Sequence, residues 1–448
     1  SERLLDWMDF MNEFVVSFGR KCIDLIHKAG KVAFMFYDDH WVGAEPYGER
    51  VADFNFDGLI KCVFNAFEVR LCSGVKGVKM KELRLHPYLF PTGLKGEPTF
   101  MEGGDPAQDA MRFWANIRRG LLRSPIDRIG LGGYLHLVQD FPDFVDTIKE
   151  ITEEFRFLQT LHTNGGPYTA PLKVAILTAW GALRSWVYVG HFIHGMELYE
   201  ATESLAGLPV EVSFISFSDI LRNGIPENVD VIINAGKSPT AWSGGEHWKN
   251  KKIIETVTKW VANGGGFIGI GEPSACEYSS QYFQLSHLLG VDKEIGKTLS
   301  KVKLELPVSS SKHFILENME DKIDFGKDVD NVYPTCKDAT ILSKKDGSIQ
   351  IALKNFYKGK SIYLSGFKFA PANTRLLHRT LYWAAGREQE FGSWTCSNIN
   401  TDCAFYPNEG KIVVINNSSD DEKTKVFDAD GKTIDVKLKP YSIEIFNI

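Results

Sequence analysis

The sequence predicts an α/β protein in three parts: the C-terminal part of a (β/α)8-type barrel, a Rossmann-like domain and a small antiparallel β-domain. Three observations lead to this prediction. Apolar runs of strand length alternate with helical patterns as far as about residue 165, and this order favours parallel βα architecture. A second alternating series follows Gly165-Gly166-Pro167, and the last part of the chain changes to period-two patterns.

The first part opens with a helix and a buried strand. Residues 4–27 have apolar residues at helical spacing, and Gly30 is a suitable C-cap. The run 31–37 is almost wholly apolar, which is typical of a buried parallel strand. Further strands are predicted at 59–64, 69–72 and 83–89, and helices at 105–122 and 141–161.

About half of a barrel is visible in this part. Ser1 leads directly into apolar residues at helical spacing. We therefore expect an upstream segment that supplies the front half of the same barrel. In such barrels the chemistry lies where the strands end, on the C-terminal face.

The middle and last parts complete the organisation. Middle-part strands are predicted at 173–177, 210–217, 229–233, 264–271 and 361–366, and helices at 184–206, 246–263 and 375–385. Period-two runs are found at 411–416, 424–427 and 442–446. The predicted domains are residues 1–165, 166–387 and 388–448.

Composition excludes several classes of function. The net charge is −6 without a basic stripe, which argues against a nucleic-acid partner. No apolar run approaches the roughly 18 residues of a membrane span. The seven cysteines are scattered without a CxxC pair, so neither a disulfide framework nor a metal site is expected. With no signal-peptide pattern, these features favour the cytoplasm.

The richest cluster of chemical groups is Asp38-Asp39-His40-Trp41-Val42-Gly43-Ala44-Glu45-Pro46-Tyr47-Gly48, directly after the strand 31–37. Glycosyl transfer needs a carboxylic acid near the bridging oxygen and polar or aromatic groups around the sugar. Burial beside Trp41 would raise the pKa of such an acid. The alternative is a surface loop in which the two aspartates cap a helix or a turn.

A second cluster is Arg84-Leu85-His86-Pro87-Tyr88-Leu89-Phe90-Pro91. Arginine presents a planar fork that suits phosphate, although an arginine at the edge of a strand explains the pattern equally. In Glu102-Gly103-Gly104-Asp105-Pro106 the aspartate is a good helix N-cap. Arg118, Arg119 and Arg123 form a local basic patch that could attract an anion, but they are interpreted as a solvated helix face.

Two glycine-rich stretches are weak signals. Residues 129–134 resemble a phosphate loop but lack its lysine and its glycine order. Residues 267–276 lie where amidotransferase-like folds place a nucleophile elbow. Cys276 comes several residues after the expected turn, and His191 and His194 belong to another helix, so we interpret the middle domain as amidotransferase-like but non-catalytic.

Taken in order, these stretches resemble the β-1,3-galactosyl-N-acetylhexosamine (galacto-N-biose/lacto-N-biose) phosphorylase family. The residues that carry the resemblance are Asp39 to Pro46, Arg84 to Pro91, Glu102 to Pro106, Pro125 to Gly130 and Gly132-Gly133-Tyr134. It covers the whole chain and the later part of a family member. Family members have a (β/α)8-like catalytic domain, an amidotransferase-like middle domain and a C-terminal β-domain.

The resemblance implies an inverting disaccharide phosphorylase, a hexosyltransferase. Inorganic phosphate attacks the anomeric carbon of a terminal β-galactoside and releases α-galactose 1-phosphate and a free acceptor sugar. Phosphate is a co-substrate, and no cofactor or metal is implied. Carried over by motif, the general acid is Asp39, with Asp38 as second choice.

The remaining implied site residues form two groups. Arg84, Tyr88 and Phe90 fall at family positions that line the phosphate and sugar site, and His40, Trp41 and Glu45 are added because they adjoin the acid. Further binding residues belong upstream of Ser1. A homodimer is what the family suggests.

Three alternatives stay open. Galactosyl-β-1,4-rhamnose is an alternative substrate, because the acceptor cannot be inferred from the sequence. A retaining β-galactosidase would need a second carboxylate roughly 5 Å from the acid, and the chain offers no convincing candidate. A non-enzymatic sugar-binding module would keep its function in an Asp39→Asn variant.

Overall fold

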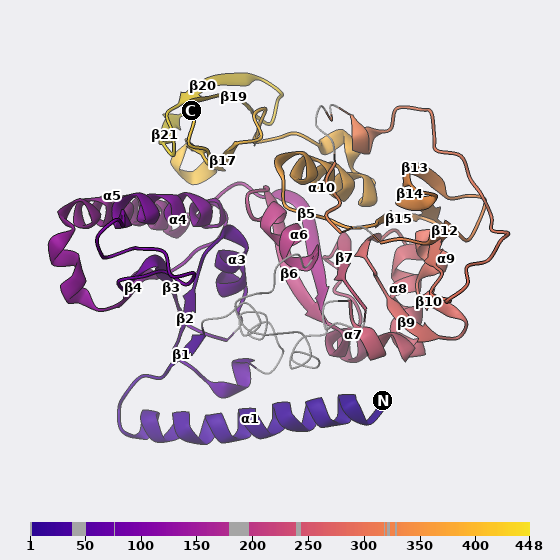
Figure 1. Cartoon of the computed structure of the whole chain (residues 1–448), viewed down its shortest axis with the longest axis horizontal. Coiled ribbons are helices and arrows are strands. Elements are labelled where there is room, and N and C mark those ends of the chain that lie inside the picture. Colours follow the sequence, from indigo (N-terminus) through magenta and orange to yellow (C-terminus); the bar gives the residue numbers. More distant parts are fainter. Residues whose placement is uncertain are drawn as a thin grey trace.

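The computed structural model describes residues 2–37, 51–75, 77–178, 197–238, 243–317, 319, 323–327 and 329–448. Figure 1 shows the first part on one side, the middle part on the other and the C-terminal strands above both. The first part contains α1 (Glu2–Lys28), β1 (Phe34–Tyr37), η2 (Val51–Phe54), β2 (Gly58–Cys62), α3 (Ala66–Gly74), β3 (Met80–Leu89), α4 (Pro106–Leu121), β4 (Arg128–Gly133), η3 (Leu135–Asp140) and α5 (Pro142–Thr163).

The first part is built on a parallel sheet in the order β1-β2-β3-β4. Side chains alternate across a strand, so each strand has one face toward the helices. Leu59 and Leu83 are fully buried in a core that also contains Trp114 of α4 and Phe144 of α5. The opposite face carries Glu82 and Arg84 of β3, which alternate with the core residues Leu83 and Leu85.

One predicted strand of this part is wrong, because residues 69–72 lie inside α3. The Glu68 carboxylate accepts a hydrogen bond from the Asn65 backbone N at 3.3 Å, which fixes the first turn of a helix. Val69 and Cys72 are three residues apart and both fully buried. That spacing belongs to a helix face as well as to a short apolar run.

The middle part contains β5 (Ala170–Thr178), α6 (Glu197–Ala206), β6 (Val210–Ser216), α7 (Phe217–Asn223), β7 (Val231–Gly236), η6 (Gly245–Lys249), α8 (Lys251–Ala262), β8 (Gly266–Gly271), β9 (Ala275–Tyr278), β10 (Gln281–Phe283), α9 (Ser286–Leu289), β11 (Val291–Lys293), η7 (Phe314–Leu316), β12 (Val332–Pro334), β13 (Thr340–Lys345), β14 (Ser348–Phe356), β15 (Gly359–Leu364), α10 (Pro371–Ala384) and η8 (Glu388–Glu390). Its seven-stranded sheet runs β13-β14-β15-β8-β7-β5-β6. The five strands from β15 to β6 are parallel, as predicted, and β13 and β14 add an antiparallel edge that the sequence pattern did not reveal.

One predicted helix of the middle part is interrupted. The Asn250 side chain accepts a hydrogen bond from the Lys252 backbone N at 3.0 Å and caps α8, so the predicted helix 246–263 is divided into η6 and α8. Of the predicted helix 184–206, the described part is α6, since residues 179–196 lie outside the described residues.

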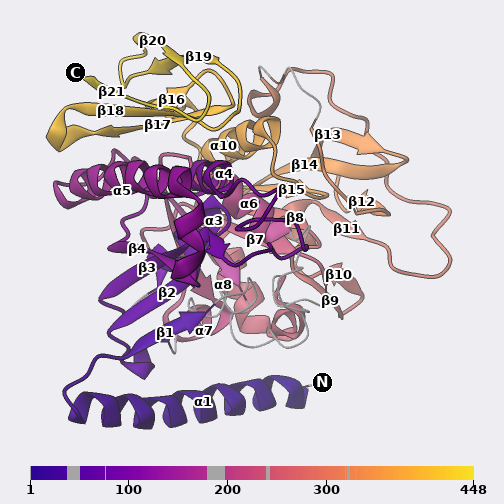
Figure 2. The ribbon, with the colours of Figure 1, turned by 60° about the vertical axis from the view of Figure 1, so that its left-hand side comes forward.

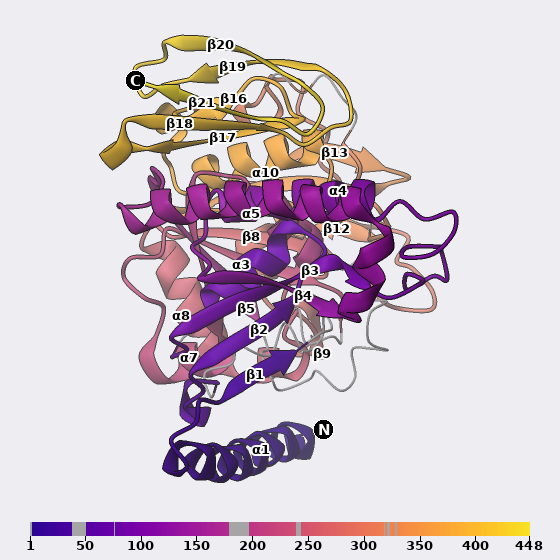
Figure 3. The same cartoon turned by 90° about the vertical axis from the view of Figure 1, so that its left-hand side faces the viewer.

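The C-terminal part contains β16 (Thr395–Cys396), β17 (Thr401–Tyr406), η9 (Pro407–Glu409), β18 (Lys411–Asn416), β19 (Glu422–Phe427), β20 (Thr433–Leu438) and β21 (Ile443–Asn447). Two antiparallel three-stranded sheets, β16-β19-β20 and β17-β18-β21, form it. Figures 2 and 3 show these strands lying over α4, α5 and α10, whereas α1 lies beyond β1 at the far end of the molecule. The Tyr406 hydroxyl donates to the Leu122 carbonyl oxygen at 3.0 Å, so the first and last parts share a core.

The three arginines at the end of α4 were expected to form a solvated face, and this interpretation is wrong. Arg118 is 1% exposed, and its Nη2 donates to the Asn416 carbonyl oxygen at 2.6 Å. Arg119 binds Asp402 of the C-terminal part at 2.7 Å and Glu203 of α6 at 2.9 Å. Arg123 donates to the backbone carbonyls of Gly207, Tyr168 and Cys403. These arginines are polar links between the three parts.

No helix among the described residues is both long and apolar enough to cross a bilayer. Within the same residues, no cluster of three or more His, Cys, Asp or Glu side chains is arranged to hold a metal ion.

Candidate active site

The face of the four-stranded sheet that lies opposite α4 and α5 is called the inward face. It carries charged and aromatic side chains toward the carboxyl ends of the parallel strands. Strand alternation places Glu82 and Arg84 on this face of β3, and the rings of His86 and Tyr88 follow toward the carboxyl end of the strand. The register pairs Ile60 of β2 with Glu82, and Cys62 with Arg84. In a barrel fold, binding and catalytic groups lie at the end of the barrel where the strands finish.

Arg84 is held by a carboxylate on its own strand. Its Nη2 lies 3.1 Å from Oε1 of Glu82, and Glu82 is 2% exposed. Oε2 of the same carboxylate accepts from Nε of Arg128 at the start of β4. Two guanidinium groups therefore share one buried carboxylate, and the cluster carries a net positive charge. Such a cluster favours an anion.

The guanidinium of Arg84 keeps unused donors. Its Nε has no hydrogen-bond partner among the residues that the structure describes, and its side chain is 22% exposed. The same guanidinium lies 5.6 Å from the ring centre of Phe36 of β1. Arg84 is therefore an anchored and partly exposed group whose buried Nε lacks a partner among the described residues, rather than an edge arginine that extends into solvent.

Aromatic rings continue this face beyond Arg84. The ring of His86 stacks on Phe64 at 3.8 Å and on Tyr88 at 4.0 Å. The ring of Phe90 meets Tyr134 edge to face at 5.5 Å. Phe90 is 39% exposed and Tyr134 58% exposed, so both rings offer apolar surface of the kind that sugar rings pack against. The structure places the predicted residues Arg84 and Tyr88 on β3 and Phe90 directly after it, and the rings of Tyr88 and Phe90 lie 6.3 Å apart.

The predicted acid and its neighbours, namely Asp38, Asp39, His40, Trp41 and Glu45, lie outside the described residues. β1 ends at Tyr37, directly before this segment, and β1 pairs with β2. The role of Asp39 stays a prediction.

The glycine-rich stretch 129–134 forms strand β4 rather than a phosphate loop. A Cβ atom at Gly130 would lie 2.8 Å from Oε1 of Glu82, and one at Gly132 would lie 3.1 Å from Nη1 of Arg84. These two glycines are on the inward face, two residues apart, and they leave room for the carboxylate and the guanidinium. At the other motif, Oδ1 of Asp105 accepts from the Gln108 backbone N at 3.0 Å and caps α4, as expected.

The middle part has no nucleophile at the expected elbow among the described residues. Cys276 lies on β9, is 6% exposed, and burial raises the pKa of its thiol. A reactive cysteine needs the opposite shift. The nearby Ser274 has a φ of +53°, and its Oγ accepts from the Leu285 backbone N at 3.0 Å. His191 and His194 lie outside the described residues.

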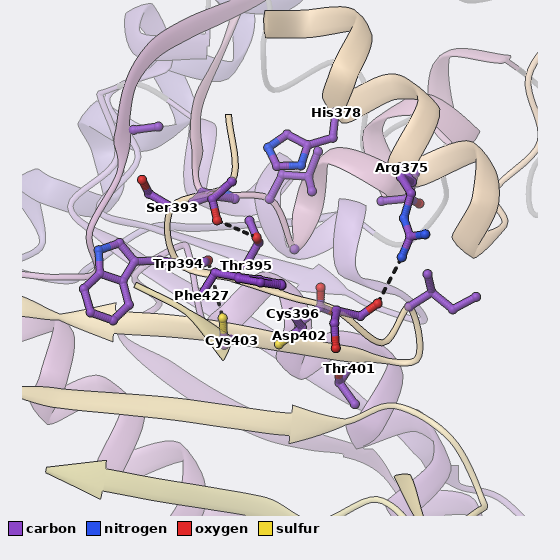
Figure 4. A pocket seen from close by; sticks show the side chains of 18 of the residues that line it. Arg375, His378, Ser393, Trp394, Thr395, Cys396, Thr401, Asp402, Cys403 and Phe427 are labelled. Carbon is purple, nitrogen blue, oxygen red and sulfur yellow. Dashed lines mark hydrogen bonds between the residues drawn. The ribbon is translucent and has the colours of Figure 1, made fainter. Parts of the chain in front are cut away.

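A cavity of about 1020 Å³ lies elsewhere, at the junction of the three parts. Figure 4 shows His378 of α10 facing side chains of the C-terminal part, with Trp394 and Asp402 among them. Arg84, Tyr88 and Phe90 do not line it. Its buried Arg119 already binds two carboxylates, so we assign the cavity to the packing of the domains and not to the reaction.

Comparison with protein families decides the classification. The model of the lacto-N-biose phosphorylase N-terminal TIM barrel domain matches residues 1–170, that of the central domain residues 173–389, and that of the C-terminal domain residues 394–446. The chain belongs to the lacto-N-biose phosphorylase family. Because β1 to β4 belong to the TIM barrel domain of this family, their inward face lies inside an α/β barrel.

Curated relatives agree with this family. A D-galactosyl-β-1→4-L-rhamnose phosphorylase of Lachnoclostridium phytofermentans is 46% identical over 94% of this chain and 58% of the relative. A 1,3-β-galactosyl-N-acetylhexosamine phosphorylase of the same organism is 40% identical over 99% of this chain and 61% of the relative. That of Bifidobacterium longum subsp. longum is 38% identical over 97% and 62%. The chain thus spans about three-fifths of the length of these relatives.

Solved structures share the fold. The β-galactosidase of Rahnella sp. R3 superposes with a TM-score of 0.61 at 13% identity, over 98% of this chain and 67% of that one. The enzyme from Bacillus circulans sp. alkalophilus gives a TM-score of 0.55 at 14% identity, over 98% of this chain and 67% of that one. At this identity the likeness supports the α/β barrel and carries no information about the reaction.

Sequence reasoning missed Phe36, Glu82, Arg128 and Tyr134 as members of this surface. The period-two pattern of β3 could have identified Glu82, since it lies two residues before Arg84 on the same face. Arg128 and Tyr134 lie within family motifs, but no local pattern indicates that they approach β3.

Proposed function

We propose that this protein is an inverting phosphorylase of terminal β-galactosides, with galactosyl-β-1,3-N-acetylhexosamine as the substrate class. Its products are α-galactose 1-phosphate and the free acceptor sugar. Family membership supports the reaction. The structural observation that carries it is the anchored and partly exposed Arg84, whose Nε has no partner among the described residues and whose guanidinium lies beside the exposed ring of Phe36.

The chemistry needs few groups from the protein. A phosphate oxygen forms a bond to the anomeric carbon while the glycosidic carbon–oxygen bond breaks on the opposite face. The leaving oxygen takes a proton from the carboxyl group of Asp39, and His40, Trp41 and Glu45, which adjoin the acid in the sequence, are the further binding residues of this proposal. Arg84 neutralises charge on phosphate, and Tyr88 and Phe90 line the sugar. No cofactor or metal takes part in this scheme.

The acceptor sugar has two candidates. The N-acetylhexosamine phosphorylases among the relatives favour N-acetylglucosamine or N-acetylgalactosamine. The relative at 46% identity acts on galactosyl-rhamnose, which favours rhamnose as the second candidate. The exposed rings of Phe90 and Tyr134 accommodate the apolar face of any of these sugars.

Several finer features belong to the same proposal. The middle part is a Rossmann-like, amidotransferase-like domain, and the last part is a separate small β-domain, with boundaries at 165/166 and 387/388. The active form is a cytoplasmic homodimer whose barrel is completed by a preceding segment, with the galactoside and phosphate as partners and neither nucleic acid nor membrane among them.

The test uses the full protein with galactosyl-β-1,3-N-acetylglucosamine, with and without inorganic phosphate, and assays galactose 1-phosphate and free galactose. We expect galactose 1-phosphate that depends on phosphate, and its loss in Asp39→Asn. Free galactose without phosphate would instead identify a retaining β-galactosidase. Parallel reactions with galactosyl-N-acetylgalactosamine and galactosyl-rhamnose assign the acceptor, and no turnover with any of the three would refute the proposal.

A further inference from the structure

The inward face contains a repeated contact between β1 and the two arginines that share Glu82. The guanidinium of Arg84 lies 5.6 Å from the ring centre of Phe36, and that of Arg128 lies 5.4 Å from the ring centre of Phe34. We call Phe36–Arg84 the upper pair and Phe34–Arg128 the lower pair. The upper pair is nearer the carboxyl ends of the strands, because Arg84 comes two residues after Glu82, which pairs with Arg128.

Phe36 reaches Arg84 across β2, whereas Phe34 meets Arg128 across β2 and β3. The sequence of β2 leaves room for both rings. Phe34 is in register with Gly58, and a Cβ atom at Gly58 would lie 2.1 Å from the Phe34 ring. Glycine at this position therefore lets the lower ring lie flat across the sheet. Phe36 is in register with Ile60, and its ring remains 51% exposed. A ring in this position contacts one face of the Arg84 guanidinium.

Glu82 and the β4 glycines restrict Arg84 from the other sides. The carboxylate binds Nη2 at 3.1 Å. The space over Gly130 and Gly132 is filled by Glu82 and Arg84, since Cβ atoms there would lie 2.8 Å from Oε1 and 3.1 Å from Nη1. Arg84 is thus held by a ring on one strand, a carboxylate on its own strand and the backbone of a third. An arginine side chain held in this way loses little conformational entropy when it binds an anion.

We propose that Phe36 and Glu82 are positioning residues that hold the Arg84 guanidinium in the orientation that binds phosphate. This inference rests on the proposed function, because it assigns phosphate to Arg84. The lower pair has the same chemistry one level further from the strand ends, so it supports the sheet and does not bind phosphate.

Matched variants separate the two pairs. Phe36→Leu removes the ring–guanidinium contact and keeps an apolar side chain, and Phe34→Leu does the same for the lower pair. Initial rates at varied phosphate and varied galactoside give both KM values for each variant. We expect Phe36→Leu to raise the phosphate KM about twofold to fivefold, the range of a partly exposed cation–π contact, with the galactoside KM unchanged. Phe34→Leu should leave both KM values unchanged.

Glu82→Gln tests the carboxylate. An amide keeps the size of the side chain but binds the two guanidinium groups less strongly, and we expect the phosphate KM to rise about tenfold, the difference between a charge-assisted and a neutral hydrogen bond. A lower phosphate KM would show that the carboxylate acts by weakening the local positive charge, which would overturn the positioning role. If Glu82→Gln does not fold, the two phenylalanine variants still decide.

Binding of inorganic phosphate by calorimetry, without galactoside, separates this inference from the proposed function. Weaker phosphate binding in Phe36→Leu than in the wild type and Phe34→Leu would support the inference even where the wild type made no galactose 1-phosphate. Equal phosphate binding and equal phosphate KM in Phe36→Leu, Phe34→Leu and wild type would overturn it, whatever the wild type catalyses.

Discussion

The arginines of α4 and those of the inward sheet face show two uses of the same side chain. Arg119 is 7% exposed and binds two carboxylates from different parts of the chain. Arg84 and Arg128 share one carboxylate, and Nε of Arg84 has no partner among the described residues. The first arrangement balances its charge inside the protein, and the second leaves positive charge for a ligand.

The difference gives a criterion for function. A buried arginine that donates its hydrogen bonds to carboxylates or carbonyls stabilises the packing of the protein. Removing one member of a buried arginine–carboxylate pair leaves an uncompensated charge. Arg118, which is 1% exposed, also has nitrogens without hydrogen-bond partners among the described residues, so exposure is the second part of the criterion. We expect that removing an arginine that is anchored at one nitrogen and partly exposed, as Arg84 is, costs little stability but costs ligand binding. Four substitutions or conditions test this comparison, in order of decreasing expected effect.

Arg119→Ala should have the largest effect, on stability. It leaves Glu203 and Asp402 without their shared cation, and burial already raises the pKa of Glu203. We expect a loss of about 3–5 kcal/mol in the free energy of unfolding, measured by denaturant titration. Arg112→Ala on the same helix removes an exposed pair with Asp109 and should cost less than about 1 kcal/mol. Equal losses in the two variants would contradict the structural role of Arg119.

Arg84→Ala should have the converse effect. We expect its kcat/KM for phosphate to fall on the order of 10²–10³-fold, as for loss of one donor to a developing anion, while its melting temperature changes little. Steady-state kinetics and a thermal melt of the same preparation provide both values. A large drop in melting temperature with an unchanged phosphate KM would show that Arg84 stabilises packing, as the arginines of α4 do, and does not bind phosphate.

Acid should weaken the junction of the three parts through His378. Burial, with Arg379 and Arg123 nearby, lowers the pKa of His378 to about 3. The unfolded chain, with a pKa of about 6.5, then binds a proton that the folded protein does not. The contribution of His378 to stability is therefore complete above pH 6.5 and is lost as the pH falls toward 3, by about 2 kcal/mol at pH 5.

His378→Leu should flatten the unfolding free energy between pH 7 and pH 5 relative to the wild type. His247, whose pKa burial lowers to about 4, acts in the same direction in both proteins and cancels in the comparison. An identical pH dependence of the two proteins would contradict a neutral His378 at the junction.

Gly132→Ala should have the smallest effect. The added Cβ would lie 3.1 Å from Nη1 of Arg84, a contact that a shift of a few tenths of an ångström relieves. We expect a rise of a few fold in the phosphate KM, equivalent to about 1 kcal/mol. Gly130→Ala presses on the buried Glu82 carboxylate at 2.8 Å and should cost more stability. No change in the phosphate KM of Gly132→Ala would mean that β4 does not restrict Arg84.

Local patterns predicted the elements well where period and capping agree. The parallel strand of 83–89, the helix after Asp105 and the strand 411–416 needed no tertiary information. The segment 69–72 failed because an apolar run of four residues fits both a strand and one face of a helix. β13 and β14 were missed, because no particular sequence pattern marks an antiparallel edge that follows a series of parallel strands.

Only the part of the candidate site that lies in one local segment could be predicted from the sequence. Arg84, Tyr88 and Phe90 lie in one short segment, and the family motif includes it. Phe36, Glu82 and Arg128 come from three strands, and only the register of the sheet brings them together. Arg118 and Arg119 are buried because they bind partners almost 300 positions later in the chain. A local sequence pattern cannot reveal partners at that distance.

That separation also has a consequence for biosynthesis. Arg119 is 283 positions before Asp402, and Arg118 is 298 positions before Asn416. At a synthesis rate of roughly 5–20 residues per second, the end of α4 waits on the order of 15–60 s on the ribosome before its last partners emerge. During that interval the charged end of α4 remains in water, and the newborn barrel segment presents the apolar surface that β17 and β18 later cover. Residues near position 400 therefore complete the packing of residues translated almost 300 positions earlier.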